Sequence, residues 1–152
     1  MQIKKIMTTG VAACRADTNL AVVTKLMWDH DCGFVPVVDA AGTVIGVLTD
    51  RDVCIASATR RLLPEQISAA ETMTKAVHVC SIDDTVADAL NMMKHGRVRR
   101  LPVVAADGTL RGIVSVNDIV LAARQKGGPT ATSILSALAA ICEHSPKAAA
   151  AA

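Results

Sequence analysis

The chain has 152 residues, 51% hydrophobic and 20% charged, which is enough apolar length to bury a core and argues against disorder over most of the chain. With one Trp, one Phe and no Tyr, it has no aromatic stacking platform for single-stranded nucleic acid. A net charge of +2 does not by itself indicate a nucleic-acid-binding protein.

The first elements in chain order predict one β-α-β-β-α unit. A short β segment at residues 11–14 precedes a helix at residues 20–28. The apolar run FVPVV, residues 34–38, predicts a buried strand. The turn DAAGT follows, in which Gly supplies a positive φ, and leads to the strand VIGVLT, residues 44–49. Asp52 then begins a second helix.

Residues 58–72 form a linker, with a short helix expected after Pro64 because proline is favoured at a helix start. The same order of elements then recurs. A β segment at residues 77–80 precedes a helix at 86–94, and strands at 100–104 and 110–115 lead to a helix that begins at Asp118.

An internal repeat underlies this recurrence. A shift of 66 residues aligns positions 7–57 with 73–123 without a gap, which indicates duplicated supersecondary units. We expect repeats at residues 3–57 and 73–123. The identical pairs include Met7/Met73, Cys14/Cys80, Pro36/Pro102, Gly42/Gly108, Gly46/Gly112 and Asp52/Asp118.

After the second repeat, apolar residues at helical spacing predict an amphipathic helix over residues 130–144, and residues 145–152 are expected to be a flexible tail. This helix either covers the module or its dimer, or binds a partner.

The five cysteines include no CxxC pair, so free thiols are favoured over disulfides or a zinc ribbon, and no metal site is expected. Cys14 and Cys80, at equivalent positions, are expected in the core. The longest uncharged stretch, residues 127–142, contains Pro, Thr and Ser and is too short to span a membrane. The N-terminus lacks the apolar core of a signal peptide. We therefore expect a cytoplasmic protein.

The doubled motifs carry a family resemblance. The M-T start, the P-V-V strand, the D-x-x-G turn and the endings GVLTDRD and GIVSVND resemble a tandem pair of cystathionine-beta-synthase (CBS) domains, or Bateman module, over residues 3–123. The resemblance is to the stand-alone bacterial type. It implies an α/β (α+β) fold in which two β-α-β-β-α repeats pack sheet to sheet about a pseudo-two-fold axis, leaving two clefts.

The same resemblance implies a non-catalytic sensor that binds AMP, ADP, ATP, NAD or S-adenosylmethionine. It also implies a disc-shaped homodimer that signals to an effector protein. Thr49 and Asp52 can be read as a helix cap or as a ribose clamp, in which the carboxylate accepts bonds from the sugar hydroxyls. Their recurrence as Ser115 and Asp118 favours the clamp.

Each cleft implied by the resemblance draws residues from both repeats. Arginines at cleft 1 suit a phosphate or pyrophosphate, and cleft 2, without that arginine pair, is expected to bind a less charged adenosine moiety, to bind more weakly, or to stay empty. For cleft 1 the residues are Val47, Thr49, Arg51, Asp52, Val77, His78, Val79, Val98, Arg99, Arg100 and Pro102. For cleft 2 they are Val11, Ala12, Ala13, Cys32, Gly33, Phe34, Pro36, Ile113, Ser115, Asn117 and Asp118.

Two other functions remain open. The basic run from Lys94 to Arg100 could bind nucleic acid, with steep salt dependence, although the total charge disfavours this. A nucleotide hydrolase is the third hypothesis, but the sequence has no P-loop, nucleophile elbow or HExxH motif, so no enzymatic activity is expected.

Overall fold

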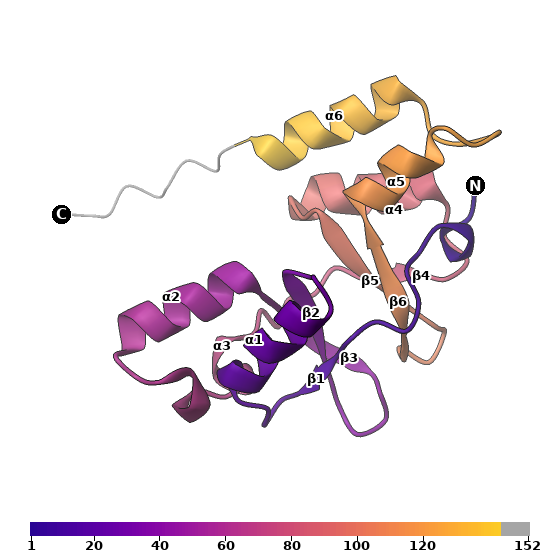
Figure 1. Cartoon of the computed structure of the whole chain (residues 1–152). Helices are drawn as coiled ribbons and strands as arrows, with labels where there is room; N and C mark the ends of the chain where they lie inside the picture. The colour runs from indigo at the N-terminus through magenta and orange to yellow at the C-terminus, as the bar shows by residue number, and fades with distance from the viewer. Residues whose placement is uncertain (144–152) are drawn as a thin grey trace.

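A computed structural model describes residues 1–143, and the expected flexible tail at residues 145–152 lies outside them. The chain folds as two similar halves, each with one three-stranded sheet and helices on its outer side (Figure 1). The first half contains β1 (Cys14–Arg15), α1 (Leu20–Asp29), β2 (Phe34–Val38), β3 (Val44–Thr49) and α2 (Asp50–Arg60), and the turn η1 (Ile3–Lys5) precedes it in the chain. The second half contains β4 (Cys80–Ser81), α4 (Val86–Gly96), β5 (Arg100–Val104), β6 (Leu110–Ser115), α5 (Val116–Ala122) and α6 (Ala131–Cys142).

The two sheets have the same topology, in the orders β1-β2-β3 and β4-β5-β6. In each, the first strand runs parallel to the second, and an antiparallel hairpin joins the second to the third. The first hairpin turns at Gly42, whose φ of 84° is in the region open to glycine, while the Asp39 carboxylate accepts bonds from the Ala41 and Thr43 N–H groups. The expected α+β class and the doubled β-α-β-β-α order are confirmed.

The halves pack sheet to sheet and exchange contacts reciprocally. The Val44 N–H donates to the Gly108 carbonyl at 3.4 Å, and the Leu110 N–H donates to the Gly42 carbonyl at 3.0 Å. Each hairpin turn therefore meets its equivalent from the other half, which is the signature of the expected pseudo-two-fold axis.

Each half has its own apolar core, and both cores receive a segment from the other half. Ile3, at the start of the chain, is fully buried in the second core, and the Thr8 N–H donates to the Ile113 carbonyl at 2.9 Å. Ile67, just before the second repeat, is fully buried in the first core. The packing units therefore cross the expected repeat limits of 3–57 and 73–123, because the segment leading into each repeat packs on the other one.

The linker holds more structure than expected. The short helix after Pro64 is present as the 3₁₀ turn η2 (Pro64–Gln66), and a second helix, α3 (Ala69–Thr72), follows it. The two initial strands are shorter than the expected 11–14 and 77–80, and begin at Cys14 and Cys80. Parallel pairing starts only at those residues, so residues 11–13 and 77–79 do not belong to a strand.

The expected C-terminal helix is present as α6, and the structure describes it up to Cys142. Its inner residues, Ile134, Ala137 and Ile141, are buried in the second core, and it packs along α4. Within residues 1–143 no helix is both long and apolar enough to cross a bilayer. Cys14 and Cys80 lie in the cores as expected, and burial raises the pKa of the Cys80 thiol to about 12.

Candidate functional site

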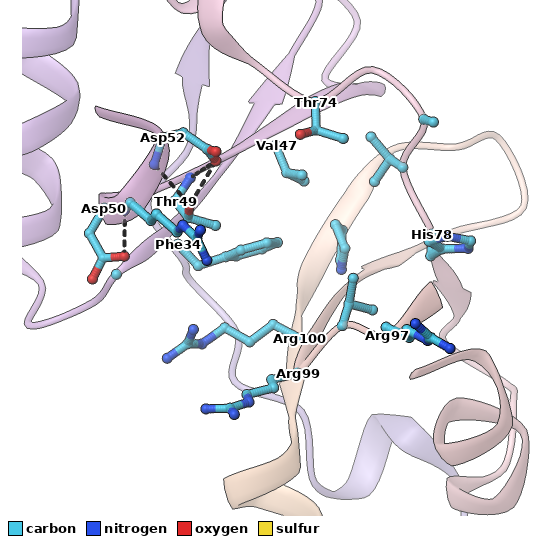
Figure 2. Close-up of a pocket in the computed structure, with 16 residues that line it drawn as sticks. Phe34, Val47, Thr49, Asp50, Asp52, Thr74, His78, Arg97, Arg99 and Arg100 are labelled. Carbon is cyan, nitrogen blue, oxygen red and sulfur yellow. Dashed lines mark hydrogen bonds between the residues drawn. The ribbon is translucent and has the colours of Figure 1, made fainter. Parts of the chain in front are cut away.

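Cleft 1 is a hollow of about 460 Å³ between the two halves, large enough for a nucleotide-sized ligand (Figure 2). One wall comes from the end of β3 and the start of α2. The facing wall comes from the segment before β4 and from the connection between α4 and β5. The lining residues are Gly33, Phe34, Val47, Thr49, Asp50, Arg51, Asp52, Thr74, Ala76, Val77, His78, Arg97, Val98, Arg99, Arg100 and Pro102.

Thr49 and Asp52 form a reciprocal helix cap at the mouth of α2. Asp52 Oδ2 accepts bonds from the Thr49 N–H at 2.8 Å and from Thr49 Oγ1 at 2.7 Å, and the Asp52 N–H donates to Thr49 Oγ1 at 3.2 Å. The helix begins at Asp50, so the expectation that Asp52 begins it was wrong: Thr49 is the cap and Asp52 is the third helical residue.

The cap and clamp interpretations are compatible in this geometry. The cap uses only one of the two carboxylate oxygens of Asp52. Among residues 1–143, no hydrogen bond reaches the other oxygen, Oδ1, and Asp52 lines the cleft. A carboxylate held in this way can accept bonds from sugar hydroxyls without giving up the cap.

Arginines occupy the part of cleft 1 formed by the α4–β5 connection. Figure 2 shows Arg99 and Arg100 extending toward the side of the cleft that holds Asp50, whereas Arg97 extends the opposite way. Arg97 Nη2 lies 3.6 Å from a carboxylate oxygen of Glu143, and Arg99 Nη2 lies 4.0 Å from the Cys142 sulfur. The end of α6 therefore borders this arginine group.

The rest of cleft 1 is mostly apolar, with Thr74 and His78 as its polar side chains, and has open backbone groups. Val47, Val77 and Pro102 line it, and Figure 2 places Val47 and Thr74 together on the side away from Arg99 and Arg100. Within the described chain, the backbone groups of His78 make no backbone hydrogen bond. An adenine ring could fill this part of the cleft and bond to such groups.

All the residues expected in cleft 1 line it except Val79, which lies just before β4 and outside the lining. Phe34 and Gly33, expected in cleft 2, line cleft 1 instead. The strand register explains this placement: Phe34 pairs with Thr49 across the hairpin, and the Gly33 carbonyl accepts a bond from the Asp50 N–H at 3.3 Å.

Sequence reasoning missed Asp50, Thr74, Ala76 and Arg97 in cleft 1. Arg97 was within reach of that reasoning, because it lies in the basic run that supplied the other two arginines. Asp50 was also within reach, because it lies in the GVLTDRD motif between two predicted site residues, whereas Thr74 and Ala76 had no such signal in the sequence pattern.

Cleft 2, of about 360 Å³, lies at the pseudo-symmetric position. Ser115 and Asp118 repeat the cap: Asp118 Oδ2 accepts bonds from the Ser115 N–H at 2.8 Å and from its hydroxyl at 2.6 Å. Pro36 is buried in β2, and neither it nor Ala13 lines the cleft. The lining residues are Thr8, Gly10, Val11, Ala12, His30, Asp31, Cys32, Arg100, Ile113, Ser115, Asn117 and Asp118.

The two clefts differ in charge. Cleft 1 is lined by the arginines 51, 97, 99 and 100 and by two aspartates, Asp50 and Asp52. Cleft 2 is lined by Arg100 alone among the lysines and arginines, together with Asp31 and Asp118. Cleft 2 therefore lacks an arginine pair, as expected. It is nevertheless lined by one arginine, Arg100, which also lines cleft 1.

The basic run from Lys94 to Arg100 does not form one continuous free face. The Lys94 amine lies 3.3 Å from the Ser136 hydroxyl, and His95 Nδ1 lies 2.7 Å from the Asn91 carbonyl oxygen. Within residues 1–143 no group of three or more His, Cys, Asp or Glu side chains is arranged to hold a metal ion.

Comparison with known protein families gives two matches along the chain. The family model named CBS domain matches residues 3–59 and 67–124. The CBS domain-containing protein YhcV of Bacillus subtilis is 32% identical over 134 residues, which cover 88% of this chain and 92% of YhcV. Inosine-5'-monophosphate dehydrogenase of Mycobacterium leprae is 33% identical over 115 residues, but the chain spans only 21% of that enzyme.

Solved structures show the same fold. The crystal structure of Hypoxic Response Protein I with two coordinated zinc ions matches with a TM-score of 0.73 and 29% identity, over 80% of this chain and 98% of the other. The crystal structure of CBSX2 in complex with AMP matches with a TM-score of 0.70 and 25% identity, over 82% of this chain and 96% of the other.

Proposed function

The chain belongs to the CBS domain family, and from this premise we propose that it is a non-catalytic sensor that binds adenosine-containing ligands between its two repeats. AMP, ADP, ATP, NAD and S-adenosylmethionine are the candidates. The relative CBSX2, crystallised with AMP, supports this ligand class.

One observation carries the proposal: a capped carboxylate, an apolar pocket and an arginine group line one cleft. Asp52 keeps one oxygen open for the ribose hydroxyls, while Val77 and Pro102 offer an apolar surface to the base. Arg99 and Arg100 offer planar donors to a phosphate. These three chemistries are the parts of an adenine nucleotide, in the order sugar, base and phosphate.

Phe34 adds an aromatic surface to this cleft. It is the only Phe in the chain, its side chain is 7% exposed, and it lines the cleft beside Thr49. A ring fixed in this way can pack against a ligand at little entropic cost, since burial has already ordered it.

Signalling to a separate effector protein, assembly into a homodimeric disc and a cytoplasmic location remain predictions that accompany this proposal. A sensor transmits occupancy only through a difference in ligand affinity between two states, so the effector must bind one of those states better.

Calorimetric titration with AMP, ATP and NAD tests the proposal. We expect at least one of them to bind the wild-type protein, and we expect an Asp52→Ala/Asp118→Ala double variant to lose binding while its circular dichroism stays native. Mass spectrometry of small molecules that copurify with the protein would identify the natural ligand. Absence of adenine-ligand binding, together with DNA or RNA binding that weakens steeply with salt, would favour the nucleic-acid function instead.

A further inference from the structure

One arginine lines both clefts. Arg100 is the first residue of β5 and pairs across the hairpin with Ser115, the hydroxyl residue of cleft 2. Its chain neighbour Arg99 lines cleft 1, and Arg100 itself lines both clefts. The guanidinium thus starts from a backbone position between the two sites, on a long and flexible stem.

No described contact holds the Arg100 guanidinium in either cleft. Arg97 and Arg99 border Glu143 and Cys142 of the α6 end, whereas within residues 1–143 Arg100 forms no ion pair and no side-chain hydrogen bond. The residue is exposed. Its side chain can therefore turn toward whichever cleft holds an anion, without breaking an existing bond.

The two clefts depend on Arg100 to different degrees. Cleft 1 keeps three other arginines if Arg100 turns away. Cleft 2 has no other lysine or arginine in its lining, and it carries Asp31 at the position where cleft 1 carries Arg97. With Arg100 turned away, a phosphate in cleft 2 would lie beside two aspartates, and His30 would be the only lining side chain left that can carry a positive charge.

We propose that Arg100 is shared by the two clefts and that phosphate-bearing ligands compete for it. This inference rests on the proposed function and adds a regulatory property to it. A phosphorylated ligand in cleft 1 draws Arg100 to its phosphate and lowers the affinity of cleft 2 for a second phosphorylated ligand. An unphosphorylated nucleoside makes no use of the guanidinium, so its binding to the two clefts is independent.

The pseudo-symmetry makes this sharing one-sided. The residue equivalent to Arg100 in the first repeat is Phe34, which is buried, uncharged and lines cleft 1 only. One guanidinium therefore serves both sites. Coupling between two binding sites is reciprocal, so cleft 2 occupancy weakens cleft 1 by the same factor, but cleft 1 fills first because of its additional arginines.

Titration with AMP and adenosine, the second lacking the phosphate, tests the proposal. Asp52→Ala disables cleft 1 and reports cleft 2 alone, and Asp118→Ala reports cleft 1 alone. In the wild-type protein, we expect the second AMP to bind at least about 5-fold more weakly than AMP binds to Asp52→Ala, the lower end of typical coupling between sites. For adenosine, the two constants should agree.

Two matched variants assign the coupling to its residue. Arg100→Ala should abolish the difference between the coupled and isolated constants and reduce the AMP affinity of cleft 2 to that of adenosine. Arg99→Ala, at the neighbouring exposed arginine, should weaken AMP in cleft 1 and retain the coupling. Circular dichroism checks that both variants are folded.

Several outcomes would overturn the inference. AMP binding to both wild-type clefts with the constants of the isolated clefts would reject the sharing while leaving the proposed function intact. Equal coupling for adenosine and AMP would place its origin in a shape change rather than in Arg100. An Asp52→Ala protein that binds no AMP would show that cleft 2 has no phosphate site to lose. A wild-type protein that binds neither compound would reject the proposed function as well.

Discussion

Replacing Asp52 by alanine should affect ligand binding and stability by separable amounts. Its Oδ2 atom accepts two bonds from Thr49 that cap α2, at 2.8 and 2.7 Å, while Oδ1 faces no described donor in the protein. Asp52→Ala removes these two bonds but retains the Thr49 cap, so it should cost about 1 kcal/mol or less of unfolding free energy. Loss of a charge-assisted hydrogen bond to a ligand costs about 2–3 kcal/mol, or roughly 30- to 150-fold in Kd.

The chain supplies a matched control for this substitution. Thr85 and Asp88 form the same reciprocal cap at the start of α4, with bonds of 3.0, 2.6 and 3.3 Å, and Asp88 lines neither cleft. Asp88→Ala should therefore lower the urea midpoint in the way Asp52→Ala does, and leave the Kd for AMP unchanged.

Calorimetry for Kd and urea unfolding for stability provide the assay. If Asp52→Ala loses stability but binds AMP as tightly as the wild type, then Asp52 only supports the Thr49 cap and does not bind the ligand. Equal weakening of AMP binding by Asp88→Ala would refute the ligand-binding role of Asp52 as well, since the effect would then follow from helix fraying rather than from the cleft.

Three further predictions concern stability. Burial raises the pKa of the Cys80 thiol from 9.0 to about 12. Between these two pH values the unfolded chain loses the thiol proton while the folded protein keeps it, which favours unfolding. The unfolding free energy measured in urea should therefore fall as the pH rises from 9 to 12. Gly112→Ala should lower the unfolding free energy by about 1–3 kcal/mol in the same assay, because the added Cβ would meet the rigid backbone carbonyl of Thr8. Gly46→Ala should cost less, because its Cβ would meet the flexible side chain of Met73. Equal losses of unfolding free energy in the two variants would contradict this account. Ile67→Ala leaves a cavity at a fully buried position of the first core and should lower the unfolding free energy by about 2–5 kcal/mol. A decrease as small as that of a surface substitution would show that the linker does not pack in this core.

Local patterns predicted most of the fold. The runs at 34–38 and 44–49 are β2 and β3 with the expected limits, because an apolar run flanked by turn residues has few alternatives. The sequence placed the start of α2 at Asp52, whereas the helix begins at Asp50. Thr49 and Asp52 both have side-chain oxygens that can cap a helix, and the sequence alone does not tell which of them is the cap.

The contents of the clefts were harder to predict, because each cleft forms between segments that are distant in the chain. The doubled motif placed Thr49 and Asp52 at a cleft, but it placed Phe34 in the wrong one. The first residue of a strand between two sites can face either, and the choice depends on the packing of the halves. For the same reason, the sequence assigned Arg100 to one cleft and the structure places it in two.

The segment that precedes each repeat packs against the other repeat, and this limits how the chain could be cut into two independent domains. A half-molecule consists of one repeat together with the segment that precedes it in the chain. The isoleucine of that segment, Ile3 or Ile67, packs in the core of the other repeat. An isolated half would therefore expose this isoleucine and leave a cavity in its own core. Two identical halves could each fill the other's hole, so a single repeat would be self-sufficient only as a mutually inserted pair. In the present chain of two repeats, the covalent linker keeps that pair together at a high effective concentration, independent of how dilute the protein is.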